Sequence, residues 1–261
     1  MTVVKCCKSS NPCLNGGRCL LPSPNSKRRF RCKCPERYQG EQCEQLIRSC
    51  RGYSKGSRIP GNYTVFDANG EPFNVFCDFD TTNSSMTWTL IQSYMLENKR
   101  HLQVPYFQDS PFNQNDPSWI QYRLSKSRME FIQQDSRKWR LTCRYDTDGV
   151  VYTDYARGLN SQVNVLTLAD DGCRNLEYIN VRGYSCSSCS ANMKQTGNYH
   201  TFIDSYYSSE LCDFKPANSK LCPSRIPMPG ENSFGFYQCA NPQHRCSSSI
   251  NSTTQTWFGA T

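Results

Sequence analysis

The residues of this chain that are best suited to chemistry are its cysteines. Cys186 and Cys189 form a C-x-x-C pair, a spacing that can exchange disulfides or hold a metal ion. No second pair follows at zinc-site spacing, and the neighbouring residues are mostly serine. We therefore predict a structural disulfide between these two cysteines.

Other catalytic patterns are weak or missing from the sequence. The three histidines, His101, His200 and His244, are far apart in polar segments, where single histidines are usually at the surface. There is no G-x-S-x-G, H-E-x-x-H or phosphate-binding loop. The carboxylates in "DTDG" and "ADDG" are typical of β-turns. The remaining catalytic alternative is a glycosidase-type pair of carboxylates that are distant in sequence. We expect no enzyme, no catalytic residue, no metal site and no cofactor.

The cysteine content indicates an oxidising compartment. The chain has 17 cysteines in 261 residues, which would be a liability as thiols in the cytosol but suit a secreted or cell-surface protein as disulfides. N-glycosylation sequons at Asn62, Asn83 and Asn251 agree with this interpretation. The start "MTVVKCCKSS" has no apolar signal-peptide core, and no apolar run is long enough to span a membrane. We expect a secreted fragment or mature form.

Changes in composition along the chain predict two domains. Residues 6–44 have almost no aliphatic side chains, so disulfides must supply much of their stability, about 2–4 kcal/mol each. Over residues 50–261, aromatic residues and valine recur between turn residues, which is enough to build a core. The segment "QLIRS", residues 45–49, is predicted to link the two domains.

The cysteine spacing of the first domain resembles that of a known family. It reads C-x5-C-x5-C-x12-C-x-C-x8-C, with "NGG" before the third cysteine and "PERYQG" in the last loop. Residues 6–44 therefore resemble an EGF-like domain. Counting cysteines leaves 15 pairings open, and the resemblance implies Cys7–Cys19, Cys13–Cys32 and Cys34–Cys43. Calcium-binding members place acidic and amide side chains before the first cysteine, where this chain has "TVVKC", so no calcium is expected.

A cluster of basic residues falls between the third and fourth cysteines. In an EGF-like fold this loop is a β-hairpin, and here it carries Lys27, Arg28, Arg29 and Arg31, with Lys33 directly after the fourth cysteine. One interpretation is a solvated hairpin tip. The other is a binding patch for sulfated polysaccharides, which the net charge of +8 would assist. A nuclear-localisation role conflicts with the disulfides, so no nucleic acid partner is expected.

The second domain opens with landmarks that resemble a fibrinogen C-terminal-like domain. Short β-branched and aromatic runs, "NYTVF", "FNVFCDF" and "TWTLIQ", alternate with turn residues such as "DANG". The resemblance is clear over residues 50–92 and implies a Cys50–Cys77 disulfide. It departs where the family's glycines before Trp88 are replaced by "TTNSSMT".

A thinner likeness continues to about residue 185. Ser127 and Glu130 have capping-box spacing, and Met129 and Ile132 share a helical face, which predicts a short helix. "KWRLTCRY" and "GVVYTDY" alternate as strands on either side of "DTDG". The implied fold is α+β with a mainly antiparallel sheet. Beyond Ser185 the family's calcium loop and pocket motifs are missing, so no binding residue is carried over.

The sequence predicts non-catalytic recognition outside the cell. We expect binding to extracellular proteins or glycans, in the matrix or between cells. The alternatives are a soluble lectin-type pattern receptor and a structural component of an extracellular or skeletal organic matrix. Because 17 is odd, one cysteine must be left over. Cys6 is the expected spare, bonded to an upstream cysteine or to a second chain, unless it takes the first EGF-like position and Cys7 is the spare.

Overall fold

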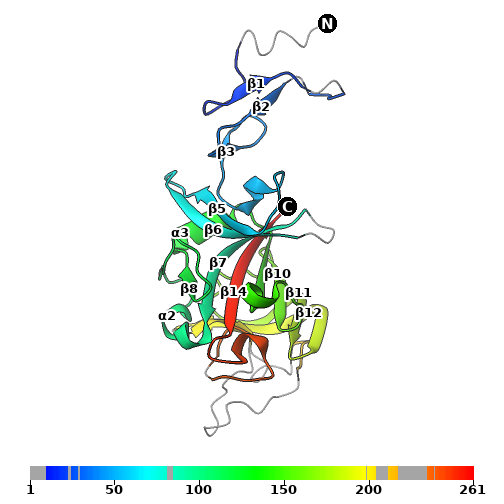
Figure 1. Cartoon of the computed structure of the whole chain (residues 1–261). Coiled ribbons are helices and arrows are strands. Elements are labelled where there is room, and N and C mark those ends of the chain that lie inside the picture. Colours follow the sequence, from blue (N-terminus) through cyan, green and yellow to red (C-terminus); the bar gives the residue numbers. More distant parts are fainter. Residues whose placement is uncertain are drawn as a thin grey trace.

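In a computed structural model of the chain, the described residues are 10–22, 25–28, 30–80, 85–197, 199–203, 211–216, 234–237 and 239–261. They form a small N-terminal module and a larger domain built on one sheet (Figure 1). The small module stands at one end of the large domain, on the side where β5 and β6 lie (Figure 1).

Two small antiparallel strand pairs build the N-terminal module. β1 pairs with β2, and β3 pairs with β4. The four strands are β1 (Arg18–Leu20), β2 (Arg31–Lys33), β3 (Tyr38–Gln39) and β4 (Gln45–Leu46). The predicted hairpin between the third and fourth cysteines is therefore present. β4 comes from segment 45–49, so the residues predicted to link the two domains also complete the second strand pair.

Disulfides replace a hydrophobic core in this module. The two pairs with both partners described are Cys13–Cys32 and Cys34–Cys43, which are the pairs that the EGF-like resemblance implied. Cys19 is also disulfide-bonded. Its expected partner, Cys7, lies outside the described residues. Cys6 lies outside them too, so its link to a second chain or an upstream cysteine stays a prediction.

The large domain is one sheet of ten described strands. Nine follow the order β13-β12-β11-β10-β9-β14-β7-β6-β5, and β8 pairs with β7 off this path. All described pairs are antiparallel, so the predicted mainly antiparallel sheet is confirmed. The strands are β5 (Gly61–Phe66), β6 (Pro72–Phe79), β7 (Thr87–Met95), β8 (Gln121–Arg123), β9 (Lys138–Cys143), β10 (Tyr155–Leu159), β11 (Asp171–Val181), β12 (Tyr184–Thr196), β13 (Tyr199–Ile203) and β14 (Thr253–Ala260).

The last strand of the chain lies in the middle of this sheet. β14 pairs with β7 on one side and β9 on the other, so it joins the two halves of the sheet (Figure 1). All eight of its residues are buried. A Cβ atom added at Gly259 would lie 2.6 Å from Trp88 Cζ3. Glycine is needed at this position because the indole packs directly on the strand backbone.

The described helices are short. They are the α-helices α2 (Lys99–Leu102), α3 (Lys126–Gln133) and α4 (Tyr145–Asp148), and the 3-10 helices η2 (Cys50–Tyr53), η3 (Leu96–Asn98) and η4 (Arg245–Ser247). α3 is the helix predicted from the sequence, and its Met129 and Ile132 are fully buried. The domain is therefore a sheet with small helical additions.

The start of α3 differs from the predicted capping box. The N-cap is Ser125 rather than Ser127, and no side-chain hydrogen bond from Ser125 caps the helix. Instead, Asp109 Oδ1 accepts the backbone N–H of Lys126 at 2.7 Å. A residue 17 positions earlier thus accepts one of the backbone N–H groups that the first turn of the helix leaves without a partner. Local sequence spacing could not predict this contact.

The strand predicted for "GVVYTDY" is wrong. α4 and a loop cover residues 145–154, and β10 begins only at Tyr155. The cause is Asp154, which is fully buried and has a left-handed φ of 52°. Its carboxylate accepts the backbone N–H groups of Arg182 at 2.6 Å and Arg245 at 2.9 Å. These partners are distant in sequence, so the apparent alternation was misleading.

Disulfides also reinforce the large domain. The pairs with both partners described are Cys50–Cys77, Cys143–Cys246, Cys173–Cys212 and Cys186–Cys189. The first is the bridge that the fibrinogen-like resemblance implied, and the last is the C-x-x-C disulfide predicted from the sequence. Cys143–Cys246 spans 103 residues, for which the chain-entropy relation gives about 4–5 kcal/mol of stabilisation.

Two of the three histidines are buried, so the expectation that they lie at the surface is wrong. His200 is 1% exposed and His244 is 0% exposed. His200 Nδ1 lies 2.7 Å from the Thr201 carbonyl oxygen, and Nε2 lies 3.0 Å from Gln92 Oε1. Burial, reinforced by nearby Arg123, lowers the pKa of His200 to about 3. The adjacent Thr201 carbonyl and the distant Gln92 side chain satisfy both ring nitrogens, which makes this burial possible. The Gln92 contact is not visible from the neighbouring residues in the sequence.

Replacing Gly259 with alanine should destabilise the large domain. The added methyl group would overlap Trp88, and such overpacking costs ~1–3 kcal/mol. Gly61→Ala is the matched control, because no atom lies within 4 Å of a Cβ built there. Urea unfolding followed by tryptophan fluorescence measures both variants, since the chain's four tryptophans all lie in the large domain. Equal unfolding midpoints for the two variants would contradict this packing.

The free energy of unfolding of the large domain should fall as the pH drops below about 6.5. An unfolded histidine binds its proton near pH 6.5, whereas buried His200 stays neutral down to a pKa of about 3. The contribution of neutral His200 to the free energy of unfolding is complete above about pH 6.5. It is lost as the pH falls toward 3, at ~1.4 kcal/mol per pH unit. Urea unfolding at pH 7 to 4 should therefore show a shallower pH dependence for His200→Gln. An unchanged slope would show that His200 is accessible to water.

Candidate functional site

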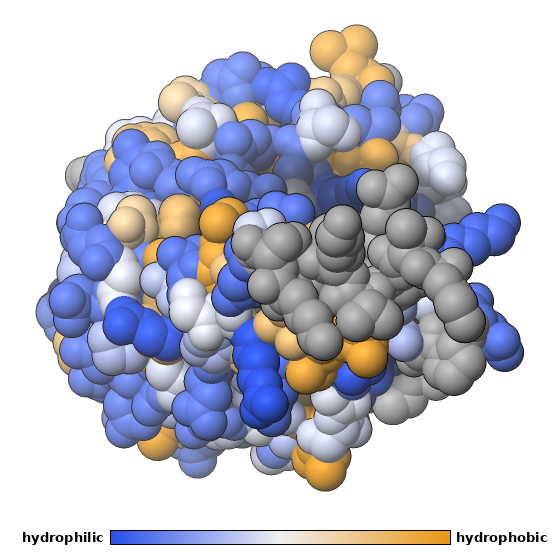
Figure 2. Space-filling view, turned by 90° about the horizontal axis from the view of Figure 1, so that it is seen from above, coloured by the Kyte–Doolittle hydropathy of each residue, from blue (hydrophilic) through white to orange (hydrophobic). Residues whose placement is uncertain are grey.

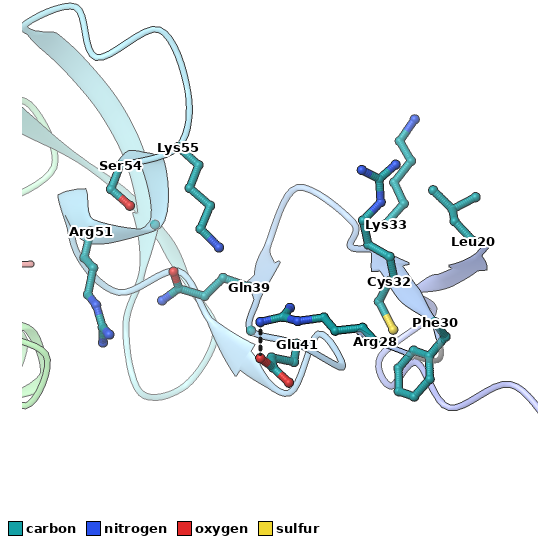
Figure 3. A pocket seen from close by; sticks show the side chains of 13 residues that line it. Leu20, Arg28, Phe30, Cys32, Lys33, Gln39, Glu41, Arg51, Ser54 and Lys55 are labelled. Carbon is teal, nitrogen blue, oxygen red and sulfur yellow. Dashed lines mark ion pairs between the residues drawn. The ribbon is translucent and has the colours of Figure 1, made fainter. Parts of the chain in front are cut away.

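A cleft of about 1050 Å³ lies between the N-terminal module and the large domain. Strand β2 and the residues around it form one side, and η2 with the turn after it forms the other (Figure 3). Five cationic side chains and one carboxylate line the cleft: Arg28, Arg31, Lys33, Arg51, Lys55 and Glu41. This composition makes the cleft attractive to anions.

Alternation along β2 places two of these cations on the exposed face of the hairpin. Arg31 and Lys33 are exposed, whereas Cys32 between them is half-buried. Successive side chains of a strand point to opposite faces, and the disulfide of Cys32 with Cys13 fixes which face is inward. Arg31 and Lys33 therefore share the outer face of the hairpin.

The hairpin also places like charges opposite each other. Arg18 on β1 is directly opposite Lys33, and Leu20 is directly opposite Arg31. Opposite residues of an antiparallel pair share a face, and like charges there destabilise the pair. Within the part of the chain that the structure describes, Arg18, Arg31 and Lys33 form no ion pair with a carboxylate. A bound anion would reduce this repulsion.

Arg51 and Lys55 reach the cleft from the large domain. η2 begins after Ser49, whose Oγ accepts the Arg51 backbone N–H at 3.4 Å. Arg51 lies 3.8 Å from Asp135, but its side chain is 45% exposed, so this ion pair is weak. Lys55 pairs with none of the described carboxylates and extends into the space between the modules (Figure 3). Sequence reasoning missed both cations because nothing local shows that they meet the hairpin.

The residues predicted to bind polyanions fall in different places. Arg28 and Arg31 line the cleft, whereas Lys27 is exposed on the hairpin connection and does not. Arg28 pairs with Glu41 at 2.7 Å, with side chains 64% and 73% exposed, so water screens the pair and it holds Arg28 only weakly. Arg29 lies outside the described residues.

The junction between the two modules is hydrogen-bonded on both sides. Ile47 donates its backbone N–H to the Arg37 carbonyl oxygen at 2.9 Å, and its own carbonyl accepts the Phe66 N–H at 2.8 Å. The Ile47 side chain is buried in the core of the large domain. Its Cγ2 lies 2.5 Å from where a Cβ on Gly52 would be. η2 therefore packs directly on Ile47.

Arg37 adds a second tie between the modules. Its guanidinium lies 4.8 Å over the Phe66 ring and donates a hydrogen bond to the Gly70 carbonyl oxygen. Phe66 ends β5 and Gly70 lies in the turn before β6. The N-terminal module is thus held against the β5–β6 hairpin, and the two sides of the cleft keep a fixed separation.

The chemistry that this cleft can perform is anion binding. Guanidinium and ammonium groups donate hydrogen bonds to sulfate or carboxylate oxygens. Leu20 and Phe30 add apolar surface beside the cations. Seen from above, the described surface is mostly hydrophilic with isolated hydrophobic residues (Figure 2). Cations on two sides of an open cleft suit an extended ligand that carries several anionic groups.

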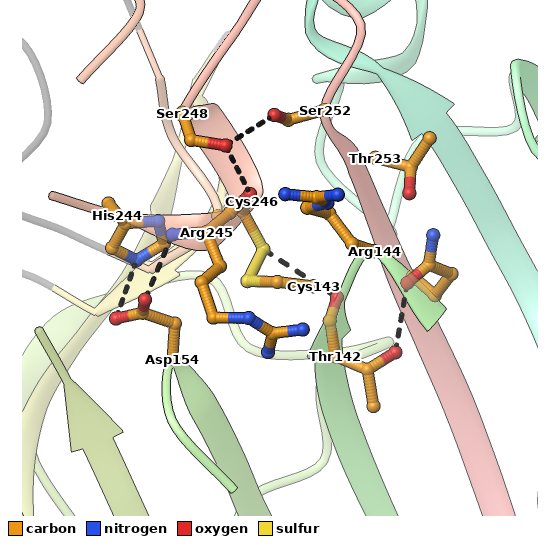
Figure 4. The surroundings of a disulfide bond; sticks show 12 residues. Thr142, Cys143, Arg144, Asp154, His244, Arg245, Cys246, Ser248, Ser252 and Thr253 are labelled. Atoms are coloured by element: carbon orange, nitrogen blue, oxygen red, sulfur yellow. Dashed lines mark hydrogen bonds and ion pairs between the residues drawn. A yellow bond between two sulfur atoms is a disulfide. The ribbon is translucent and has the colours of Figure 1, made fainter. Parts of the chain in front are cut away.

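A second polar cluster surrounds the Cys143–Cys246 disulfide (Figure 4). These two cysteines and His244 place their ligand atoms within 4.8 Å of one another, a grouping that suits a metal ion. The sulfur atoms are bonded to each other, so neither is available as a thiolate. His244 Nε2 lies 3.6 Å from Asp154 Oδ1, and burial lowers the pKa of His244 to about 4 despite that carboxylate. The imidazole is therefore neutral at pH 7, and the cluster serves to hold η4 against β9.

The carboxylates of "DTDG" and "ADDG" do not gather into a site. "DTDG" contributes three residues to α4 rather than forming a simple turn. Three of these carboxylates are paired with cations: Asp148 with Arg245 at 2.7 Å, Asp170 with Arg174 at 2.6 Å and Asp171 with Lys194 at 3.3 Å. Asp146 accepts a hydrogen bond from the Thr253 hydroxyl.

The sequons also lie apart from one another. Asn62 is exposed on β5, and Asn251 is exposed in the turn that precedes β14. Asn83 lies outside the described residues.

Comparison with known proteins identifies the N-terminal module. Residues 7–42 match the family model of the EGF-like domain. The module is an EGF-like domain. The human protein jagged-2 is 41% identical over 42 residues, which are 16% of this chain and 3% of that protein. The chain therefore matches only a small part of this relative. The two matches support an extracellular or cell-surface location.

None of the described helices combines the length and the apolar composition that are needed to cross a membrane.

Proposed function

We propose that this protein is a non-catalytic extracellular recognition protein that binds sulfated polysaccharides in the cleft between its EGF-like domain and its large domain. The observation that supports this most is the outer face of the hairpin, where Arg18 stands opposite Lys33 and Arg31 follows on the same face. Sulfate groups bound there would offset the repulsion between these cations. Arg51 and Lys55 extend the positive surface onto the large domain.

The exposure of these cations favours a polymer over a small anion. Exposed ion pairs contribute only about 0.2–1 kcal/mol each, so useful affinity requires several pairs at once. A polysaccharide with repeated sulfate groups can contact both sides of the cleft together. Binding of this kind should weaken as salt rises, because the Debye length falls to about 8 Å at physiological ionic strength.

We also propose that residues 50–261 form a divergent fibrinogen C-terminal-like domain. The mainly antiparallel sheet and the Cys50–Cys77 disulfide support this. Further support comes from β5, β6 and β7, which contain "NYTVF", "FNVFCDF" and "TWTLIQ". A two-domain binding protein of this kind fits an adhesion or matrix role, and the proposal includes no calcium-dependent step.

Heparin affinity chromatography tests the cleft. The double variant Arg31→Ser/Lys33→Ser loses two cleft cations and should elute at clearly lower salt than the native chain. At about 0.2–1 kcal/mol per lost pair, its affinity for a heparin oligosaccharide should fall roughly twofold to thirtyfold. Lys27→Ser/Arg100→Ser removes the same charge outside the cleft, from the hairpin connection and from α2 at the far end of the large domain (Figure 1), and should elute near the native position.

The outcomes separate the alternatives. Equal shifts for both double variants would mean that net charge governs retention and that the hairpin is a solvated tip. No shift for Arg31→Ser/Lys33→Ser would overturn the proposal. Calcium-dependent retention on immobilised neutral sugars would favour the lectin alternative, and recovery from tissue only after denaturant or decalcification would favour the structural one.

A further inference from the structure

A second, smaller pocket lies beside the edge strand β5. Its volume is about 270 Å³, and Asn62, Phe76, Leu90, Pro117 and Trp119 are among its lining residues. β5 is the last strand in the sheet order, so the pocket opens at the edge of the sheet. Pockets for drug-sized ligands hold about 300–1,000 Å³. This smaller one therefore suits a single ring.

Two aromatic rings form a wall of this pocket. Phe76 and Trp119 are half-buried, with ring centroids 4.8 Å apart and planes inclined by 63°. The Ser93 hydroxyl donates a hydrogen bond to the Trp119 carbonyl oxygen at 2.7 Å, and fully buried Trp257 supports Phe76 from behind at 6.2 Å. The rings are therefore held in place while part of their surface stays open. Such aromatic faces attract C–H groups of positive character.

Asn62 stands directly across the strand pair from Phe76. Opposite residues of an antiparallel pair share a face, with Cβ atoms about 4.5–5.5 Å apart. The Asn62 side chain is exposed, and its amide makes no hydrogen bond within the described residues. Asn62, Tyr63 and Thr64 form an N-glycosylation sequon. A sugar on this amide would start next to the aromatic wall.

We propose that Asn62 carries an N-linked glycan whose first N-acetylglucosamine lies in this pocket against Trp119 and Phe76. The side-chain nitrogen forms a bond to C1 of that sugar, and the bond from C1 to the pyrophosphate of a lipid-linked oligosaccharide donor breaks. The lipid pyrophosphate leaves with the electron pair, and the amide nitrogen gives one proton to the transferase. No group is oxidised or reduced.

The docked sugar has two physical effects. Its apolar C–H face covers aromatic surface that is otherwise in contact with water. The glycan also stands on the edge strand β5, where it blocks the addition of a strand from another chain. Asn251, the other described sequon, does not line this pocket, so a glycan there should have neither effect.

Iodide quenching of tryptophan fluorescence measures the position of the sugar. The chain's four tryptophans are all described, and Trp88, Trp139 and Trp257 are at most 2% exposed. Quenching by a charged solute therefore reports Trp119. In protein secreted from eukaryotic cells, mass spectrometry should find the glycan on Asn62. The quenching constant should be at least twofold lower for this protein than for Asn62→Gln.

Two controls identify the sugar that protects Trp119. Trimming with an endoglycosidase that leaves one N-acetylglucosamine should preserve the protection, because only the first sugar occupies the pocket. Asn251→Gln should be quenched like the native glycoprotein. Unoccupied Asn62, equal quenching of the native protein and Asn62→Gln, or loss of protection on trimming would each overturn the proposal.

Thermal unfolding gives an independent readout. Asn62→Gln should lower Tm by about 2–4 °C, and this shift should disappear in a Trp119→Leu background, where the sugar has lost its main contact. An equal shift in both backgrounds would overturn the docking. If Trp119→Leu does not fold, the quenching comparison, which needs no change in the pocket, still decides.

Discussion

Ile47 joins two domains that are stabilised in different ways, one by disulfides and one by a sheet. Its backbone bonds to Arg37 on one side and Phe66 on the other, and its side chain is buried in the core of the large domain. A chain that was free at this point would let the hairpin move away from η2. Because residue 47 is held in three ways, the cations of the hairpin line the same cleft as Arg51 and Lys55. The cleft therefore results from a hydrophobic contact and two backbone hydrogen bonds at Ile47, together with the contacts of Arg37 to Phe66 and Gly70.

The surface that receives Ile47 is itself fixed by the large sheet. Asp78 on β6 and Arg140 on β9 form a buried ion pair at 2.6 Å, and Arg140 lies 4.4 Å from the Trp88 ring and 4.7 Å from the Trp257 ring. These residues come from four neighbouring strands, β6, β7, β14 and β9. Burying two charges is costly unless they are well paired, and here the carboxylate and the aromatic rings enclose the guanidinium. The pair links the centre of the sheet to the β5–β6 hairpin on which the EGF-like domain rests.

Local patterns were enough to predict the parts of the fold that depend on neighbouring residues. The EGF-like resemblance implied the Cys13–Cys32 and Cys34–Cys43 disulfides that the structure contains, and turn residues around β-branched runs predicted β5, β6 and β7. Contacts between distant segments could not be predicted in this way. Asp154 ends a strand pattern by bonding to Arg182 and Arg245, and Lys55 enters the candidate site only because the junction places it beside the hairpin. The basic residues of the hairpin were visible in the sequence, but the second side of their cleft was not.

The most direct test of this account changes the junction and leaves every cation in place. Insertion of Gly-Ser-Gly-Ser between Leu46 and Ile47 keeps the net charge of +8. It separates the EGF-like domain from Ile47 and η2 by a flexible linker, which lowers the effective concentration of the hairpin cations near Arg51 and Lys55. The same four residues added after Thr261 serve as the control, and disulfide mapping confirms that both domains are folded. Calorimetric titration with a heparin oligosaccharide should show severalfold weaker binding for the junction insertion and native affinity for the control. Equal affinity of the two proteins would show that the cations act separately and that no shared cleft binds the polysaccharide.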